Sequence, residues 1–126
     1  MAKRVAIIGA GAAGLVTARE MLRAGHQPVV FEQSQSLGGV WVYSPETEDD
    51  PLGQHGRRIH GSLYASLRTN LPRDLMAFID FPFDTPVDAT KEWPRFPGHT
   101  CVRAYLEAFA RHFDLLPLIR FGARVE

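Results

Sequence analysis

The first residues of the chain change from one hydrophobic period to another. The run VAII at residues 5–8 is continuous, apolar and partly β-branched, and it ends at a glycine, which is typical of a short buried strand. From residue 12 to residue 24 apolar side chains recur every three or four positions, while Arg19, Glu20 and Arg23 take the other face. This pattern predicts an amphipathic helix directly after the strand.

A second strand completes the unit. Gly25 stands where the C′ residue of a helix is expected, because glycine adopts the left-handed conformation without steric cost. The segment QPVVFE follows and predicts a strand over residues 28–31. Residues 4–32 therefore form a β-α-β unit, whose crossover connection implies parallel strands.

Regular periodicity fades between residues 33 and 99, where proline, glycine, aspartate, serine and arginine are interspersed with aromatic residues. A structureless loop of that length is uncommon in a compact domain, so we expect short helical turns that wrap over a ligand or a neighbouring domain. Thr100 can cap a helix that runs to about Phe113. The final IRFGARVE predicts a strand with alternate residues pointing inward: Ile119, Phe121, Ala123 and Val125.

The expected fold class is α/β, a partial Rossmann-like, doubly wound parallel sheet. It has about three parallel strands, two main helices and a long irregular excursion, all within one domain portion, residues 1–126. The first and most apolar strand would lie at an open edge where a further strand should pair. We therefore expect the chain to be a fragment or a truncated product.

Composition excludes several classes of protein. Lys and Arg number 14, as do Asp and Glu, so charge favours neither nucleic acid nor an anionic membrane as a partner. The apolar segment near the N-terminus is broken by glycines and charges, so neither a signal peptide nor a membrane span is expected. The single cysteine, Cys101, favours a reducing, cytoplasmic location. The five histidines have no spacing suited to a metal site, and no metal is expected.

The glycine cluster GAGAAG carries the first candidate chemistry. Gly9 permits a sharp exit from the strand, Gly11 lets a pyrophosphate approach the backbone, and Gly14 lets helix and strand pack closely. The helix N-terminus then offers free N–H groups and a partial positive charge to phosphates. Glu32 lies 18 positions after Gly14 at the end of the second strand, where its carboxylate can accept hydrogen bonds from both ribose hydroxyls. The motif predicts the adenosine end of a dinucleotide.

The glycine motif alone does not decide which of two dinucleotides binds. A carboxylate at residue 32 would repel the 2′-phosphate of NADP, which leaves NAD or FAD. The following SQSLGGVW contains Gly38 and Gly39, where backbone could approach a longer dinucleotide a second time, although a plain Gly-Gly turn explains this segment equally well.

Longer blocks of the sequence carry a resemblance. GAGAAGL, Glu32, LGGVWVYSP, SLYASLRTNLPRDLMAFIDFPF and FPGHTCVRAYLEAFARHF resemble the N-terminal FAD-binding part of flavin-containing monooxygenases, closest to the plant S-oxygenating group typified by glucosinolate S-oxygenases. The resemblance implies FAD as the bound cofactor. It also implies the cofactor-binding residues: Gly9, Ala10, Gly11, Ala12, Ala13 and Gly14 at the pyrophosphate, Glu32 at the ribose, Gly39, Val40 and Trp41 toward the flavin, and Thr69, Asn70 and Leu71 at the isoalloxazine and the nicotinamide of NADP.

The same resemblance implies an activity. In the family NADPH reduces the flavin, oxygen adds at C4a, and the hydroperoxyflavin oxygenates a soft sulfur or nitrogen nucleophile. The cofactor carries this chemistry, so the protein needs orientation and exclusion of water. Asn70 suits such a catalytic task, because its amide can donate and accept without adding charge; from the residues alone, TNLP is also a plausible turn.

The chain departs from the family in one respect. It lacks a second glycine-rich strand-helix unit, so the NADPH-binding domain is absent and is expected downstream. Two alternatives remain: a truncated, non-catalytic product that binds FAD or its adenylate half, and an NAD-dependent oxidoreductase module, which the irregular middle segment disfavours.

Overall fold

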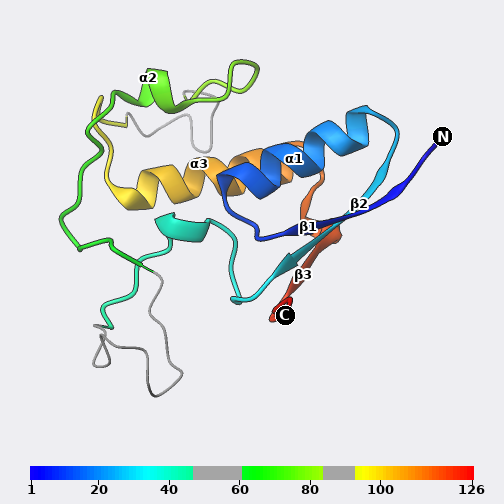
Figure 1. Cartoon of the computed structure of the whole chain (residues 1–126). Coiled ribbons are helices and arrows are strands. Elements are labelled where there is room, and N and C mark those ends of the chain that lie inside the picture. The colour runs from blue at the N-terminus through cyan, green and yellow to red at the C-terminus, as the bar shows by residue number, and fades with distance from the viewer. Residues whose placement is uncertain (47–60, 84–92) are drawn as a thin grey trace.

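A computed structural model describes residues 1–46, 61–83 and 93–126 (Figure 1). Its elements follow the predicted order of strand, helix, strand, irregular excursion, helix and strand. They are β1 (Arg4–Ile8), α1 (Ala12–Arg23), β2 (Gln27–Glu32), the 3-10 turn η1 (Gly39–Trp41), α2 (Arg73–Met76), α3 (His99–His112), the 3-10 turn η2 (Leu116–Leu118) and β3 (Ile119–Phe121). The turns η1 and α2 are the short helical segments expected within the excursion.

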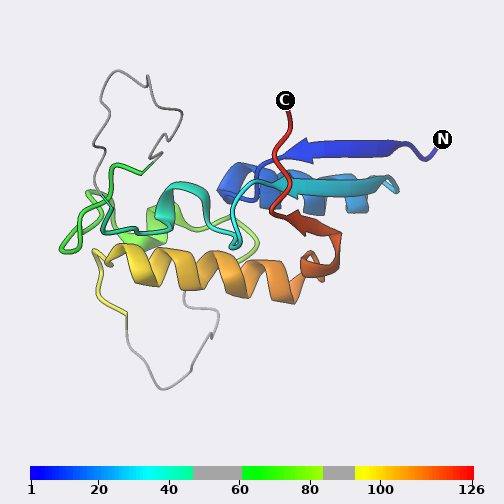
Figure 2. The same cartoon turned by 90° about the horizontal axis from the view of Figure 1, so that it is seen from below.

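The three strands form one parallel sheet in the order β1-β2-β3. Their register places Ile7 beside Val30, and Val30 beside Ile119, so these three buried side chains point to the same face. This face meets the helices, whose long axes run beside the sheet in Figures 1 and 2. The predicted parallel α/β fold with β1 at an edge of the described sheet is confirmed.

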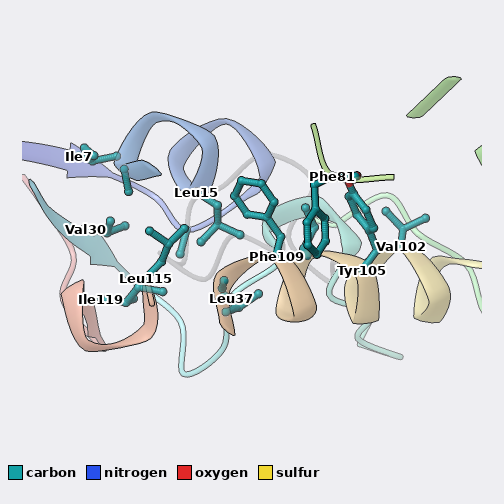
Figure 3. Close-up of a cluster of buried hydrophobic side chains, with 14 of the residues drawn as sticks. Ile7, Leu15, Val30, Leu37, Phe81, Val102, Tyr105, Phe109, Leu115 and Ile119 are labelled. Atoms are coloured by element: carbon teal, nitrogen blue, oxygen red, sulfur yellow. The ribbon is translucent and has the colours of Figure 1, made fainter. Parts of the chain in front are cut away.

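The core lies between this face of the sheet and the two long helices (Figure 3). Leu15 of α1, Phe109 of α3 and Leu115 after α3 have no exposed surface and fill its centre. Phe81, from the excursion, packs edge-on against Phe109, with ring centroids 5.4 Å apart. Part of the excursion thus belongs to the core, and it covers the side of α3 that the sheet does not reach.

The opposite face of the sheet is open in the described part of the chain. Ile8 is 72% exposed although it is a large apolar residue in a strand, and Ala6 on the same side is also exposed. Arg120 of β3 continues this exposed side. The fold therefore leaves an apolar strip along β1 without a covering helix.

The prediction that Arg19 lies on the outer, polar face of its helix is wrong. Arg19 is only 7% exposed, and its guanidinium lies 5.0 Å from the ring centroids of both Phe109 and Phe113. It donates to Asp80 from Nη1 at 2.7 Å and to Glu20 from Nε at 2.8 Å. An arginine can pack its flat face on aromatic rings while its edge binds carboxylates, so this residue joins α1 to α3 and to the excursion.

Two boundaries also differ from the prediction. Thr100 is not the cap of α3, because the helix begins at His99 with Gly98 as the N-cap residue. The last strand ends at Phe121, since Gly122 has φ 67° and turns the chain out of the sheet. Phe121, the last residue of the strand, and Val125, beyond it, are exposed, so neither is part of the core.

Candidate functional site

The glycine turn between β1 and α1 is shaped by close backbone packing. Gly9 has φ 93°, a conformation that L side chains rarely adopt, and its N–H donates to the carbonyl of Phe31 at 2.8 Å. A Cβ on Gly14 would lie 1.9 Å from the carbonyl oxygen of Gly9, so only glycine allows α1 to start this close to the strand. These two positions have the roles that the sequence predicts for them.

The N-terminus of α1 presents backbone donors. Gly11 is its N-cap residue, with extended φ and ψ and no side-chain cap, and the first helical bond runs from Leu15 N to Gly11 O at 3.0 Å. The amides of residues 12–14 precede that bond and have no acceptor within the helix. Together with the helix dipole they form a site suited to an anionic phosphate group.

Glu32 at the end of β2 reaches back to this turn. Its Oε2 accepts the N–H of Ala10 at 2.7 Å, and its Oε1 accepts the N–H of Ser34 at 2.8 Å. Burial alone would raise the pKa of Glu32, but the hydrogen bonds from Ala10 and Ser34 outweigh burial and hold the pKa below its usual value. The carboxylate is therefore charged at neutral pH and lies beside the predicted phosphate site.

The Gly38-Gly39 pair packs directly on the glycine turn. Gly38 has φ 125° and donates its N–H to the carbonyl of Ala10 at 3.0 Å. Gly39 has φ 56°, and a Cβ there would lie 3.0 Å from the Cα of Gly11. The pair is thus more than a free surface turn, because it forms a second wall against the first glycine motif.

Val40 and Trp41 follow that wall within η1. Val40 is 63% exposed, and Trp41 is partly buried against the core. The exposed Val40 is free to contact a ligand that extends along the wall, whereas the contact that the resemblance implies for Val40 and Trp41 stays a prediction.

Thr69, Asn70 and Leu71 form a second group, held by the segment that leads into α3. Thr69 is buried, with its N–H donating to Pro97 O at 3.0 Å and its hydroxyl donating to Leu71 O at 2.8 Å. The Thr69 side chain is therefore engaged within its own turn. Asn70 and Leu71 are exposed and remain available to a ligand.

Helix α3 connects the two groups. The Asn70 turn lies at the start of α3, where the N-cap residue Gly98 pairs with Arg68 in an isolated bridge. The Gly38-Gly39 pair lies beside Arg103 of the same helix, since a Cβ on Gly38 would be 3.5 Å from the Cγ of Arg103. Arg103 lies five positions after Gly98, which is about 8 Å along the helix axis. The glycine turn and the Asn70 turn are thus spaced along α3 instead of forming one compact cluster, an arrangement suited to an extended ligand.

Sequence reasoning missed the segment after β3 as part of this site. Gly122 donates its N–H to Ser34 O at 3.0 Å, and Ala123 donates to Glu32 O at 2.9 Å. These bonds hold the loop after Glu32 against the end of β3. The glycine that ends the strand was the available signal, but its partners lie about ninety residues earlier in the chain.

Comparison with known proteins agrees with this geometry. Residues 2–126 match the family described as Flavin-binding monooxygenase-like. The chain belongs to this family. The predicted membership of the flavin-containing monooxygenase family and the Rossmann-like fold are thereby confirmed.

Plant S-oxygenating members of this family are among the similar proteins. Flavin-containing monooxygenase FMO GS-OX-like 2 of Arabidopsis thaliana is 52% identical over 126 residues, covering 98% of this chain and 27% of the relative. The solved S-allyl-L-cysteine S-oxygenase from Allium sativum is 50% identical, with a TM-score of 0.85, over 94% of this chain and 27% of that one. Tmm from Pelagibacter sp. strain HTCC7211 is 31% identical with a TM-score of 0.74, over 96% and 28% of the two chains. This chain therefore spans about a quarter of the length of these relatives.

The predicted flavin cofactor is confirmed at the level of the family, which is described as flavin-binding. A solved protein described as OTEMO in complex with FAD and NADP shares the fold, at 20% identity and a TM-score of 0.62, and NADP stays a prediction for this chain. Among the described residues, none of the helices has the length and hydrophobicity that a membrane span requires. The cytoplasmic location stays a prediction.

Proposed function

We propose that this chain is the FAD-binding N-terminal portion of an NADPH-dependent monooxygenase that oxygenates soft sulfur or nitrogen nucleophiles. One observation carries the proposal: the Gly9–Gly14 turn, the charged Glu32 and the Gly38-Gly39 wall pack into a single unit at the N-terminus of α1. Free backbone amides beside a carboxylate are the donors and acceptors that a pyrophosphate joined to a ribose requires.

The residues fit an extended FAD better than a shorter ligand. The amides of residues 12–14 would bind the pyrophosphate, Glu32 would accept bonds from the adenosine ribose, and Gly39, Val40 and Trp41 would lie along the path toward the flavin. Asn70 and Leu71, in the turn held by the segment that leads into α3, would reach the isoalloxazine ring and the nicotinamide of NADP. When bound, the flavin supplies the oxygen-transfer chemistry, and the chain binds and orients it.

Domain organisation belongs to the same proposal. Residues 1–126 form one FAD-binding unit, and the NADPH-binding domain would lie outside them, within the further length that the relatives possess. The substrate and oxygen would meet the flavin where these two parts face each other. A methylthio or allylthio compound is the substrate class suggested by the plant S-oxygenating relatives.

Binding of FAD by the chain is the first test. Titration of the 126-residue chain, followed by flavin fluorescence, should show tight binding of FAD that NAD displaces only weakly. Preference for NAD would favour the dehydrogenase alternative, and a folded chain that binds neither dinucleotide would contradict the proposal.

Oxygenation is tested with a chimera. Residues 1–126 replace the matching part of the Allium sativum S-oxygenase, and the product from S-allyl-L-cysteine is measured with NADPH and oxygen. Turnover is expected. A chimera that binds FAD but forms no oxygenated product would leave the chain as a non-catalytic FAD-binding fragment, which is the alternative.

A further inference from the structure

The buried amide of Ala10 lies within the proposed pyrophosphate turn, and its hydrogen bonds are made to the protein itself. Ala10 has no exposed surface, and its N–H donates to Oε2 of Glu32 at 2.7 Å across 22 residues of sequence. Its carbonyl accepts the N–H of Gly38 at 3.0 Å. Both polar groups of this residue are thus used inside the protein, so the orientation of the turn is determined before any ligand arrives.

Glu32 makes the stronger of these two bonds. A carboxylate that accepts a backbone N–H forms a charge-assisted bond, which is roughly twice as strong as a bond between neutral groups. Its second oxygen is held by Ser34 at 2.8 Å, so the side chain cannot swing away from Ala10 without breaking a second bond. The carboxylate is therefore a fixed bridge between the end of β2 and the glycine turn.

The carboxylate keeps acceptor capacity beyond this bridge. An ionised carboxylate offers about four lone-pair positions, and the bonds from Ala10 and Ser34 use two of them. Two positions remain for the two ribose hydroxyls. Holding the turn and binding the ribose are thus compatible tasks for one side chain.

We propose that Glu32 is a positioning residue for the pyrophosphate-binding turn, in addition to its contact with the ribose. By holding the N–H of Ala10, Glu32 sets the direction of the following amides, residues 11–14, toward the phosphates. A pyrophosphate ligand then finds its donors already arranged and loses less free energy in ordering them. This inference rests on the proposed binding of FAD.

The deciding experiment separates the two tasks by removing the ribose hydroxyls from the ligand. Affinities of the wild-type chain and the Glu32→Gln variant are measured for FAD and for an FAD analogue with a 2′,3′-dideoxyadenosine. The glutamine side chain has the same shape but bears one acceptor and one donor group, so it cannot satisfy both N–H groups at residues 10 and 34. Loss of a bond to a charged group predicts a weakening of about tenfold to hundredfold, for the analogue as well as for FAD. Glu126→Gln, which removes an exposed carboxylate, is the charge-matched control and should bind both ligands like the wild type.

Each outcome bears on the inference. If Glu32→Gln weakens FAD but leaves the dideoxy analogue unchanged, Glu32 acts through the ribose alone and the inference is wrong. Amide hydrogen exchange gives a second measure without ligand: exchange of the Ala10 amide, and of the Gly38 amide that donates to the Ala10 carbonyl, should rise in Glu32→Gln and in Glu32→Ala, and unchanged exchange in both would overturn the inference. A wild-type chain that binds neither ligand contradicts the proposed function, and hydrogen exchange then decides the positioning role by itself.

Discussion

Gly14 offers a test in which helix propensity and tertiary packing predict opposite signs. Propensity alone predicts that Gly14→Ala raises the free energy of unfolding by about 1 kcal/mol, because alanine is the better helix former. In the structure, however, the new Cβ would lie 1.9 Å from the carbonyl oxygen of Gly9, whereas ordinary contact begins at 3.4 Å. Helix and turn would have to separate by about 1.5 Å.

The clash is costly because the opposing atom cannot rotate away. Overpacking in a core costs about 1–3 kcal/mol even where side chains can adjust. A backbone oxygen in a turn has no such freedom, so we expect the upper end of that range and a net loss of at least about 2 kcal/mol after the gain in propensity. This is a large share of the ~5–15 kcal/mol that stabilises a typical domain.

Urea unfolding followed by circular dichroism measures the effect, with two glycine controls. Gly61→Ala should be nearly neutral, since nothing lies within 4 Å of the new Cβ and its φ is not restricted to glycine. Gly25→Ala meets open space but has φ 74°, so it isolates backbone strain, at about 1–2 kcal/mol. A Gly14→Ala variant as stable as the wild type, or more stable, would refute the predicted clash with Gly9.

Three further predictions concern packing and titration. Arg19→Lys keeps the charge but loses the planar guanidinium that stacks on two phenylalanine rings and binds two carboxylates. The free energy of unfolding in urea should therefore fall by about 1–3 kcal/mol. Equal stability of the variant would show that an ammonium group is sufficient at this position. Tyr105→Phe should cost about 1–3 kcal/mol, because the hydroxyl accepts the N–H of Phe78 at 2.8 Å and donates to the carbonyl of Phe81 at 2.7 Å. Burial raises the pKa of Tyr105, so the contribution of its hydroxyl to the free energy of unfolding is complete below about pH 10 and is lost as the pH rises through the raised pKa. The phenylalanine variant should lack this loss of stability at alkaline pH. Identical pH profiles of stability for the variant and the wild type would contradict the prediction. The exposed apolar strip along β1 is expected to promote self-association, so Ile8→Thr should reduce concentration-dependent association in sedimentation velocity without lowering the free energy of unfolding. Equal association of the variant and the wild type would contradict this role of the strip.

Sequence alone determined the features that depend on near neighbours. The β-α-β order, the parallel sheet and the glycine turn were predicted because hydrophobic periodicity and the backbone freedom of glycine determine the conformation of residues close by in the sequence. Gly25 shows the same principle: it ends α1 with φ 74°, and the backbone requirement is satisfied locally, by its own N–H bond to Leu22 O at 2.9 Å. The position of Glu32 at the end of β2 was also predicted, because the spacing from the glycine motif reflects the length of one helix and one strand.

Only the tertiary structure decided how these parts work together. Helical spacing assigned Arg19 to the outer face, but its partners Asp80 and Phe109 lie far away in sequence, and no local pattern reveals them. In the same way, the sequence predicted a ligand contact for Glu32 but not its bond to Ala10, 22 residues earlier. A side chain's type and spacing determine which element it belongs to, whereas its burial and partners depend on the segments that the folded chain brings beside it.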